Sequence, residues 1–459
     1  MLSLKNLFGA PAPFFAGLLL AQSSIAHAQS APAPEPPPAA PVPGLTTPAP
    51  AVAPAPTVTP APPALPTYAT GKPAEPTTPA AAAPASGPSI AAAPGKGVTV
   101  TSADGNYSMM IRPRVQLRGT LTKDDATTGL EVQVRTLRLV MAGNVLSPDL
   151  KYYIQLAFGG GDFDNGSASP IFDAFVEYTK FRDFNLRVGQ FFVPFDRART
   201  TREFGLQFVD RQGVVRELTL DRDVGIMLSS QDLLGLGGKL GYYAFVGGGD
   251  GKNRFADSKN KYGPQTPGAL FVGRLVARPF GAFDDDLEGD LTRTATPKLL
   301  IGVGAAYNLS SDRDHSTYGN TYTLGTFNYT HVAADMVFKW HGFSFFHEFL
   351  YRNANKESIT RTVSGAPVTE RSRSGYGYFA QVGQMVTKQL EVVARAETLK
   401  GKDSALKTVA RASGRQVGGG LNLYLNGHFF KLQTDYFYVF GDDIGRGQHV
   451  ARIQLDASF

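Results

Sequence analysis

The stretch that decides the fold is the last one of the chain, HVARIQLDASF, residues 449–459. Its odd-numbered residues are mostly apolar. Its even-numbered residues are polar, namely Arg452, Gln454, Asp456 and Ser458, with Val450 as the exception. This period of two over eleven residues predicts one long strand with an apolar and a polar face. A globular strand has about five or six residues, whereas a tilted strand needs roughly nine to eleven to cross a bilayer. Because a membrane accepts a sheet only as a closed barrel, the stretch predicts a transmembrane β-barrel.

The composition agrees with a barrel and excludes several other classes. The 459 residues include no cysteine, which excludes a disulfide framework, a thiolate nucleophile and a cysteine-ligated metal. The seven His are scattered, so we expect no metal and no cofactor. The mean hydropathy of -0.13 is that of a soluble chain, but strands that turn every second residue to water hide from this measure. The net charge of +6 comes from Lys and Arg spread along the chain rather than gathered in a patch, which argues against nucleic acid as a partner.

The N-terminus reads as a secretion signal at residues 1–28. Lys5 provides the positive start, Phe14–Ala21 the apolar core, and Ala26–Ala28 a small-x-small cleavage site. The apolar run is too short for a membrane-spanning helix, and no other stretch approaches the roughly 20 residues that one requires. We therefore expect an exported protein without a transmembrane helix.

Residues 29–106 are predicted to be a disordered, periplasmic linker. Between Ser30 and Lys96 the chain is nearly all Pro, Ala, Thr and Val, and it cannot bury enough apolar surface to offset chain entropy. Part of it should adopt polyproline II conformation. A plain spacer is favoured over a tether that contacts peptidoglycan, since composition alone does not name a partner.

Residues 107–459 are predicted to form the barrel. Sixteen candidate strands begin near Met109, Val134, Lys151, Ile171, Phe184, Asp223, Lys239, Ala269, Leu299, Val332, Phe343, Gly375, Leu390, Val417, Phe429 and Gln448. Short connections such as His341-Gly342 carry tight-turn residues, whereas four others are long. The long ones are Gly159–Pro170, Phe280–Pro297, Ser310–Thr330 and Asn353–Ser374. Short turns on one side and long loops on the other are typical of outer-membrane barrels, and sixteen strands are compatible with an aqueous channel.

Several segments, in this order, resemble the phosphate-selective porin O/P family. They are RTLRLVMAG (Arg135–Gly143), AFVEY (Ala174–Tyr178), LRVGQFFVPF (Leu186–Phe195), RDVG (Arg222–Gly225), LEVVARAE (Leu390–Glu397) and GLNLYL (Gly420–Leu425). The resemblance covers about residues 107–459. It implies a sixteen-stranded, homotrimeric pore in the bacterial outer membrane that passes phosphate or related anions. It also implies that Arg and Lys on the wall and on an inward-folded loop bind the anion.

The first strand carries the clearest candidates for anion binding. Arg112, Arg114 and Arg118 alternate with apolar residues, so they would line one wall about 7 Å apart. Arginine suits phosphate because its planar fork donates paired, charge-assisted hydrogen bonds. The same parity turns further residues towards the lumen, namely Arg138, Arg274, Arg278, Arg395, Lys431 and Arg452. Several of these are expected to pair with Asp173, Glu177, Glu391, Glu397, Asp435 or Asp456.

The connection from Pro194 to Leu220 is the predicted constriction loop. Its basic residues are Arg197, Arg199, Arg202, Arg211 and Arg216, and its acidic ones are Asp196, Glu203, Asp210 and Glu217. A narrow site lowers the effective dielectric, so each of these charges would count for more there. Five basic against four acidic residues is a slight excess, and an ordinary extracellular loop with solvated ion pairs is nearly as good an interpretation.

The favoured function is passive diffusion of small anions, most plausibly phosphate, through a barrel surrounded by outer-membrane lipid and lipopolysaccharide. A general porin, or one for other anionic solutes with weak selectivity, is the alternative in the same class. A structural tether between outer membrane and cell wall is the alternative in another class. No catalytic residue is predicted, because no grouping of Ser and His suggests a nucleophile with its base.

Overall fold

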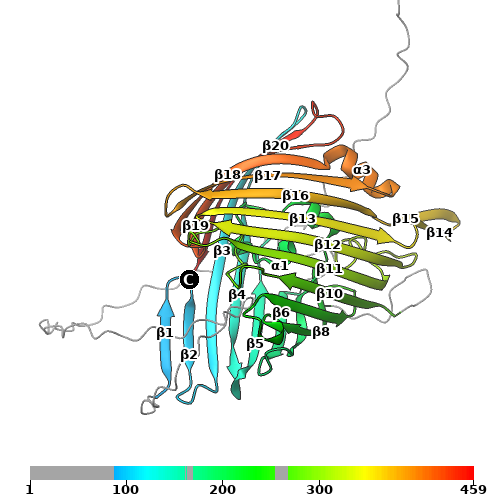
Figure 1. The fold of residues 1–459 in the computed structure, drawn as a ribbon. Coiled ribbons are helices and arrows are strands. Elements are labelled where there is room, and N and C mark those ends of the chain that lie inside the picture. The colour runs from blue at the N-terminus through cyan, green and yellow to red at the C-terminus, as the bar shows by residue number, and fades with distance from the viewer. Residues whose placement is uncertain (1–86, 161, 163–168, 254–266) are drawn as a thin grey trace, which may run out of the picture. The chain divides into compact units, whose positions relative to one another are not determined.

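The computed structural model describes residues 87–160, 162, 169–253 and 267–459, which form a closed antiparallel β-barrel (Figure 1). The predicted signal peptide, residues 1–28, and the part of the predicted linker from 29 to 86 lie outside the described residues. The first eight barrel strands are β3 (Ser108–Lys123), β4 (Thr128–Val145), β5 (Ser147–Ala157), β6 (Ile171–Tyr178), β7 (Asn185–Phe192), β8 (Arg222–Ser230), β9 (Leu240–Gly247) and β10 (Ala269–Ala277). The other eight are β11 (Lys298–Ser311), β12 (Phe327–Trp340), β13 (Phe343–Ala354), β16 (Gly375–Met385), β17 (Leu390–Gly401), β18 (Arg415–Asn426), β19 (Phe430–Phe440) and β20 (Gln448–Ser458).

The C-terminal strand closes the barrel against the first one. β20 pairs antiparallel with β3 from His449 opposite Lys123 to Ser458 opposite Arg114. Its alternation has the predicted consequence, because Ile453 is 52% exposed on the outside while Gln454 and Asp456 are buried within. The sixteen-stranded barrel predicted from the sequence is therefore confirmed.

Most predicted strand starts agree with the structure to within a few residues. The largest differences are at β12, which begins five residues before the predicted Val332, and at β4. β4 begins at Thr128, six residues before the predicted start at Val134. Residues 128–134 pair with β3 alone, and nearly all of them are exposed on either face of the ribbon. Leu130, Val132 and Val134 nevertheless alternate with Glu131 and Gln133, so the period of two extends into this segment and the predicted start lies too late.

The C-terminal end of the predicted linker is structured, which corrects the boundary at residue 106. Residues 89–101 form a hairpin of β1 (Ser89–Ala93) and β2 (Gly97–Thr101), and β2 continues the sheet beside the start of β3 (Figure 1). Val98 and Val100 lie opposite Ile111 and Met109. The turn requires glycine at position 97, where φ is +76° and a Cβ would meet the Ile111 carbonyl oxygen. The composition of the preceding stretch masked this short alternating segment.

The prediction that all long connections share one side of the barrel is wrong for the segment 278–297. This segment links β10 to β11, so it lies at the same end as the short turn between β12 and β13. It is long because it folds inward, as described below, rather than extending from the rim.

The remaining elements are short and belong to connections between barrel strands. They are the two-stranded sheet β14 (Ser358–Val363) and β15 (Ala366–Arg371), the helices α1 (Arg197–Thr200), α2 (Gly213–Leu218) and α3 (Ser404–Ser413), and the 3-10 turns η1 (Glu203–Gly205) and η2 (Leu233–Gly235). No helix among the described residues is both long and apolar enough to span a membrane.

Candidate functional site: an arginine passage inside the barrel

The loop between β7 and β8, residues 193–221, crosses the interior of the barrel. It carries α1, η1 and α2, and its backbone bonds to strands on the far wall. Gly213 and Val214 donate their N–H groups to Glu397 of β17 at 3.1 and 3.0 Å. Arg197 and Ala198 donate theirs to Oε2 of Glu348 on β13, at 3.0 and 2.9 Å. Glutamates of the opposite wall thus satisfy N–H groups that the first turn of each helix leaves free.

One face of the loop is apolar and packs on an apolar part of the wall, which we call the loop seat. The loop contributes Phe195, Val215, Leu218 and Leu220, all fully buried. The wall contributes Val276, Leu300, Val337, Phe346, Leu350, Phe379 and Leu399 from β10–β17. Burial of each large side chain stabilises the docked loop by about 1.5–3 kcal/mol. These inward-facing apolar residues were not expected from the sequence, which suggested a polar lining throughout.

The segment 278–297 braces the loop from the other end of the barrel. Its Glu288 donates its backbone N–H to the Gly205 carbonyl oxygen at 3.0 Å and accepts from the Gln207 N–H at 2.8 Å. Asp286 and Asp285 lie 3.3 and 3.8 Å from the Arg197 guanidinium. Arg197 therefore faces acids of this segment and not the open side of the loop.

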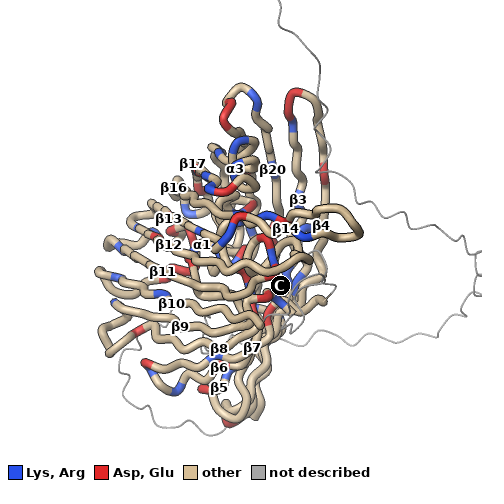
Figure 2. Tube along the Cα trace, turned by 90° about the vertical axis from the view of Figure 1, so that its right-hand side faces the viewer, with Lys and Arg blue, Asp and Glu red and all other residues tan. Residues whose placement is uncertain are grey.

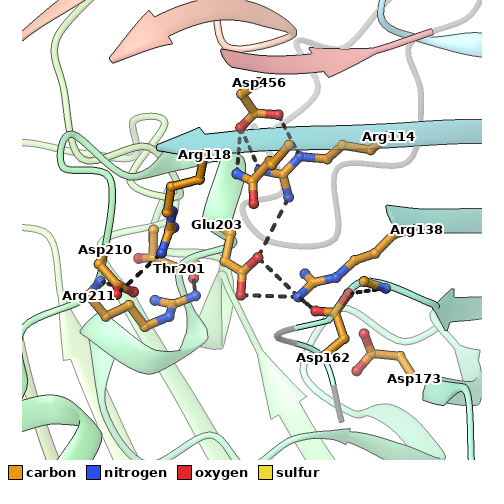
Figure 3. A network of polar contacts seen from close by, with 12 residues as sticks. Arg114, Arg118, Arg138, Asp162, Asp173, Thr201, Glu203, Asp210, Arg211 and Asp456 are labelled. Carbon is orange, nitrogen blue, oxygen red and sulfur yellow. Dashed lines mark hydrogen bonds and ion pairs between the residues drawn. The ribbon is translucent and has the colours of Figure 1, made fainter. Parts of the chain in front are cut away.

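The other face of the loop looks towards β3–β5 across two adjoining cavities, the arginine passage. The arginines that line the first cavity are Arg112, Arg114, Arg138, Arg202, Arg211 and Arg222. Those that line the second are Arg118, Arg135, Arg199, Arg211 and Arg216. Ten arginines thus line the passage, against two carboxylates, Glu203 and Asp210. Figure 2 shows basic and acidic segments close together around α1, and Figure 3 shows the side chains of this network.

Half of these arginines have a carboxylate partner. Asp456 receives two hydrogen bonds from Arg114, at 2.9 and 2.6 Å, and Asp162 receives one from Arg138 at 2.5 Å. Arg118 lies 3.5 Å from Asp210. Arg199 binds Asp221, and Arg222 binds Asp173.

The other half lack such a partner. Over the described residues, no carboxylate lies within 4.0 Å of the guanidinium group of Arg112, Arg135, Arg202, Arg211 or Arg216. Arg211 is buried and uses its Nη atoms on the carbonyl oxygens of Ala198 and Thr201. Its Nε finds no acceptor in the described part of the chain. Such a group attracts an anion, because burial makes an uncompensated charge costly.

Aromatic rings hold several of the passage arginines in place. The Arg112 guanidinium carbon lies 5.9 Å from the centre of the Phe204 ring, and that of Arg202 lies 4.7 Å from the Tyr153 ring. Arg222 lies 3.7 Å from the Phe192 ring. A ring face attracts the cation without neutralising it, so the N–H edge of Arg112 stays available to a ligand. Arg202 also donates one N–H to the Tyr153 hydroxyl, and the N–H edge of Arg222 is engaged by Asp173.

Loop charges in the passage are shifted by their neighbours. Burial raises the pKa of Glu203 and of Asp210, but nearby arginines outweigh burial and hold both pKa values well below the usual range. Burial, followed by Arg199, lowers the pKa of Arg211 to about 10. Both acids and the arginine are therefore ionised at neutral pH.

The predicted site residues divide between the passage and the paired interior. Arg112, Arg114, Arg118 and Arg138 line the passage, as do four of the five loop arginines, Arg197 being the exception. The others also lie inside but are engaged: Arg274 with Asp335, Arg278 with Asp285, and Arg452 with Asp435. Lys431 donates to the carbonyl oxygens of Phe204 and Leu206, and Arg395 donates to that of Asp210. Two of the four loop acids are turned away, because Asp196 caps α1 and Glu217 binds Arg352 and Arg373.

Sequence reasoning missed Arg135 and Arg222. Strict alternation from Arg138 would place Arg135 on the lipid side, but the register shifts between Gln116 and Leu117 of β3, opposite Thr136 and Val134 of β4. Arg135 is the additional residue of this bulge, and bulges re-aim side chains. Arg222, at the start of β8, lies within the quoted RDVG segment, which was the available signal.

Comparison with known protein families identifies the family of this chain. The model of the family described as phosphate-selective porin O and P matches residues 114–459. The chain belongs to this family. The porin is accordingly a bacterial outer-membrane channel and not an enzyme, and the resemblance noted in the sequence is confirmed.

Solved structures similar to this porin include other outer-membrane proteins. The outer membrane channel DcaP of Acinetobacter baumannii is 12% identical, with 76% of this chain and 97% of that chain covered and a TM-score of 0.46. OmpF of Salmonella typhi, in complex with daunomycin, is 13% identical, with 77% and 98% covered and a TM-score of 0.48. OprB of Pseudomonas putida is 9% identical, with 76% and 94% covered and a TM-score of 0.47. A search of curated proteins finds no match to this porin.

Proposed function

We propose that this porin lets small anions, phosphate foremost, diffuse through the arginine passage. The observation that carries the proposal is the charge of the lining, where ten arginines face two carboxylates and five of the arginines have no carboxylate partner. Within the loop, four arginines line the passage against two acids, because Arg197, Asp196 and Glu217 point elsewhere. Strands β3, β4 and β8 add the other six arginines. Membership in the family is a second support.

The geometry suggests how an anion would move. Arg112, Arg114 and Arg118 follow one another along β3, and the guanidinium groups of Arg202, Arg211 and Arg216 lie across from them on the loop. A phosphate oxygen can exchange one fork of N–H donors for the next without passing through bare water. Conduction needs binding firm enough to draw the ion in and loose enough to release it, and short steps between equivalent donors meet both needs.

The direct test is electrical. In a planar bilayer with a potassium chloride gradient, the reversal potential should show chloride preference, and added phosphate should block the chloride current. The double variant Arg112→Gln/Arg202→Gln should lose several-fold in chloride-over-potassium permeability, since neither residue supports a carboxylate. Arg411→Gln/Arg446→Gln is the control with the same charge change, because Arg411 of α3 and Arg446 are both exposed. Cation preference in the unmodified protein would overturn the proposal.

A weakly selective general porin is the second candidate. It is favoured by Glu203 and Asp210 in the passage and by the pairing of Arg274, Arg278 and Arg452. Such a porin would show chloride preference without block by millimolar phosphate, so the same recording separates the two.

We also propose that the barrel is a homotrimer embedded in lipid. The outer face exposes large apolar side chains around the whole wall, such as Val132, Ile226, Leu275, Val303 and Tyr378. An apolar surface of this extent requires lipid or protein cover. Cross-linking of the purified porin should give a ladder that ends at three copies.

A further inference from the structure

Glu203 is the one carboxylate that lines both cavities of the passage in the described part of the chain. Its side chain is 29% exposed, whereas those of Arg114 and Arg138 are 8% and 6% exposed. The carboxylate therefore stands in the path at the junction, with arginines around it (Figure 3).

The arginines next to Glu203 do not depend on it. Arg138 Nη2 lies 3.0 Å from Glu203 Oε2, and Arg114 Nη1 lies 4.0 Å from it. Each guanidinium already has another carboxylate, since Asp456 binds Arg114 in a bidentate manner and Asp162 binds Arg138. Glu203 is thus an additional acid, placed on N–H donors that would otherwise face the passage.

The backbone at Glu203 is fixed, whereas among the described residues its carboxylate contacts only the guanidinium groups of Arg138 and Arg114. Lys431 Nζ binds the next carbonyl oxygen, that of Phe204, at 2.8 Å, and Glu288 N–H binds that of Gly205 at 3.0 Å. The glutamate side chain has three rotatable bonds and reaches into open space from this anchored turn. Arginines keep the carboxylate ionised, as the lowered pKa of Glu203 indicates.

We propose that Glu203 is a tethered counter-ion that a permeating oxyanion displaces from Arg138 and Arg114 at the junction of the two cavities. This inference rests on the proposed function and adds its regulation. Five arginines without carboxylate partners would hold a multivalent oxyanion long enough to block the channel. A carboxylate that competes for the same donors weakens binding and speeds release, which passive flux requires.

The test is the phosphate dependence of chloride current through single channels. Glu203→Gln keeps the size of the side chain and removes its charge. We expect the half-blocking concentration of inorganic phosphate to fall about tenfold and the blocked dwell time to lengthen by the same factor. Glu131→Gln, with the same charge change on the exposed outer part of β4, should behave like the unmodified porin. Glu203→Asp keeps the charge but shortens the reach, so it should fall between the two and serves if the glutamine variant does not fold.

The outcomes separate this inference from the function on which it rests. Chloride preference and phosphate block in the unmodified porin, together with unchanged or weaker block in both Glu203 variants, would overturn the tethered counter-ion alone. Absence of chloride preference in the unmodified porin and in Glu131→Gln would overturn the proposed function itself. Tighter block in Glu203→Gln with normal barrel folding, checked by circular dichroism, supports both.

Discussion

The two sides of the infolded loop meet very different walls. Towards β10–β17, the loop seat is apolar, and every loop charge there has a specific partner, such as Arg197 with Asp286. Towards β3–β5, the arginine passage is open and polar, and arginines outnumber carboxylates. The same loop thus has one face that anchors it and one face that lines the passage. The residues of the barrel wall opposite each face determine this difference.

The difference between the two faces explains how the barrel can hold many arginines close together. Like charges gathered along the passage repel one another, so the loop that carries four of the ten arginines must be held from behind. The loop seat and the two wall glutamates, Glu348 and Glu397, supply that hold. The stability of the seat is therefore a condition for selectivity in the passage.

The largest effect is expected from releasing the loop at its seat. Glu348→Ala/Glu397→Ala removes four hydrogen bonds from backbone N–H groups and weakens loop docking by roughly 3–6 kcal/mol. The loop should leave the interior part of the time, which raises single-channel conductance and current noise and exposes Arg202 to trypsin. Glu131→Gln again serves as control. Quiet channels of unchanged conductance would show that apolar packing alone holds the loop.

The features that could be predicted from the sequence are the local ones, and those that could not depend on contacts between distant parts of the chain. Alternation in β20 and its counterparts predicts sixteen strands, their faces and the inward position of Arg112, Arg114 and Arg118, because a period of two is a local property. The infolded loop could be placed by its position after the fifth strand. Its two faces could not, because they depend on which distant strands of the wall lie opposite.

Three features illustrate this limit. The bulge at Arg135 is a change of register, which leaves no mark in the order of residue types. The apolar inner wall at Phe346 and Leu350 looks, by sequence, like the lipid face of a neighbouring strand. The segment 278–297 reads as an external loop, although its acids bind Arg197 and Arg278 inside the barrel.

A smaller effect, confined to selectivity, is expected from the passage wall. Arg112→Ala/Arg114→Ala/Arg118→Ala should lower the chloride-over-potassium permeability ratio about tenfold, which is only ~1.4 kcal/mol because water and ions screen most of each charge. The loss should exceed that of Arg112→Gln/Arg202→Gln, since Asp456 and Asp210 are left without Arg114 and Arg118. An unchanged reversal potential would show that the arginines of β3 do not determine selectivity. It would not affect the conclusion that the loop seat holds the loop.

The smallest effect is expected from mild acid, which should protonate an acid next to Arg197 but none in the passage. Burial, and after it the neighbouring acids, raise the pKa of Asp286 to about 6 against the pull of Arg197. The ordinary value is 3.8, so the folded barrel binds a proton that the unfolded chain does not, and the Asp286 contribution to stability rises as pH falls from 7 to 5. Asp286→Asn should abolish this small rise in thermal melting temperature, followed by circular dichroism.

On the passage side Glu203 and Asp210 stay ionised over the same pH range, so the chloride reversal potential should not change. A shift towards stronger anion preference at pH 5 would mean that an acid of the passage titrates there, contrary to its position among arginines.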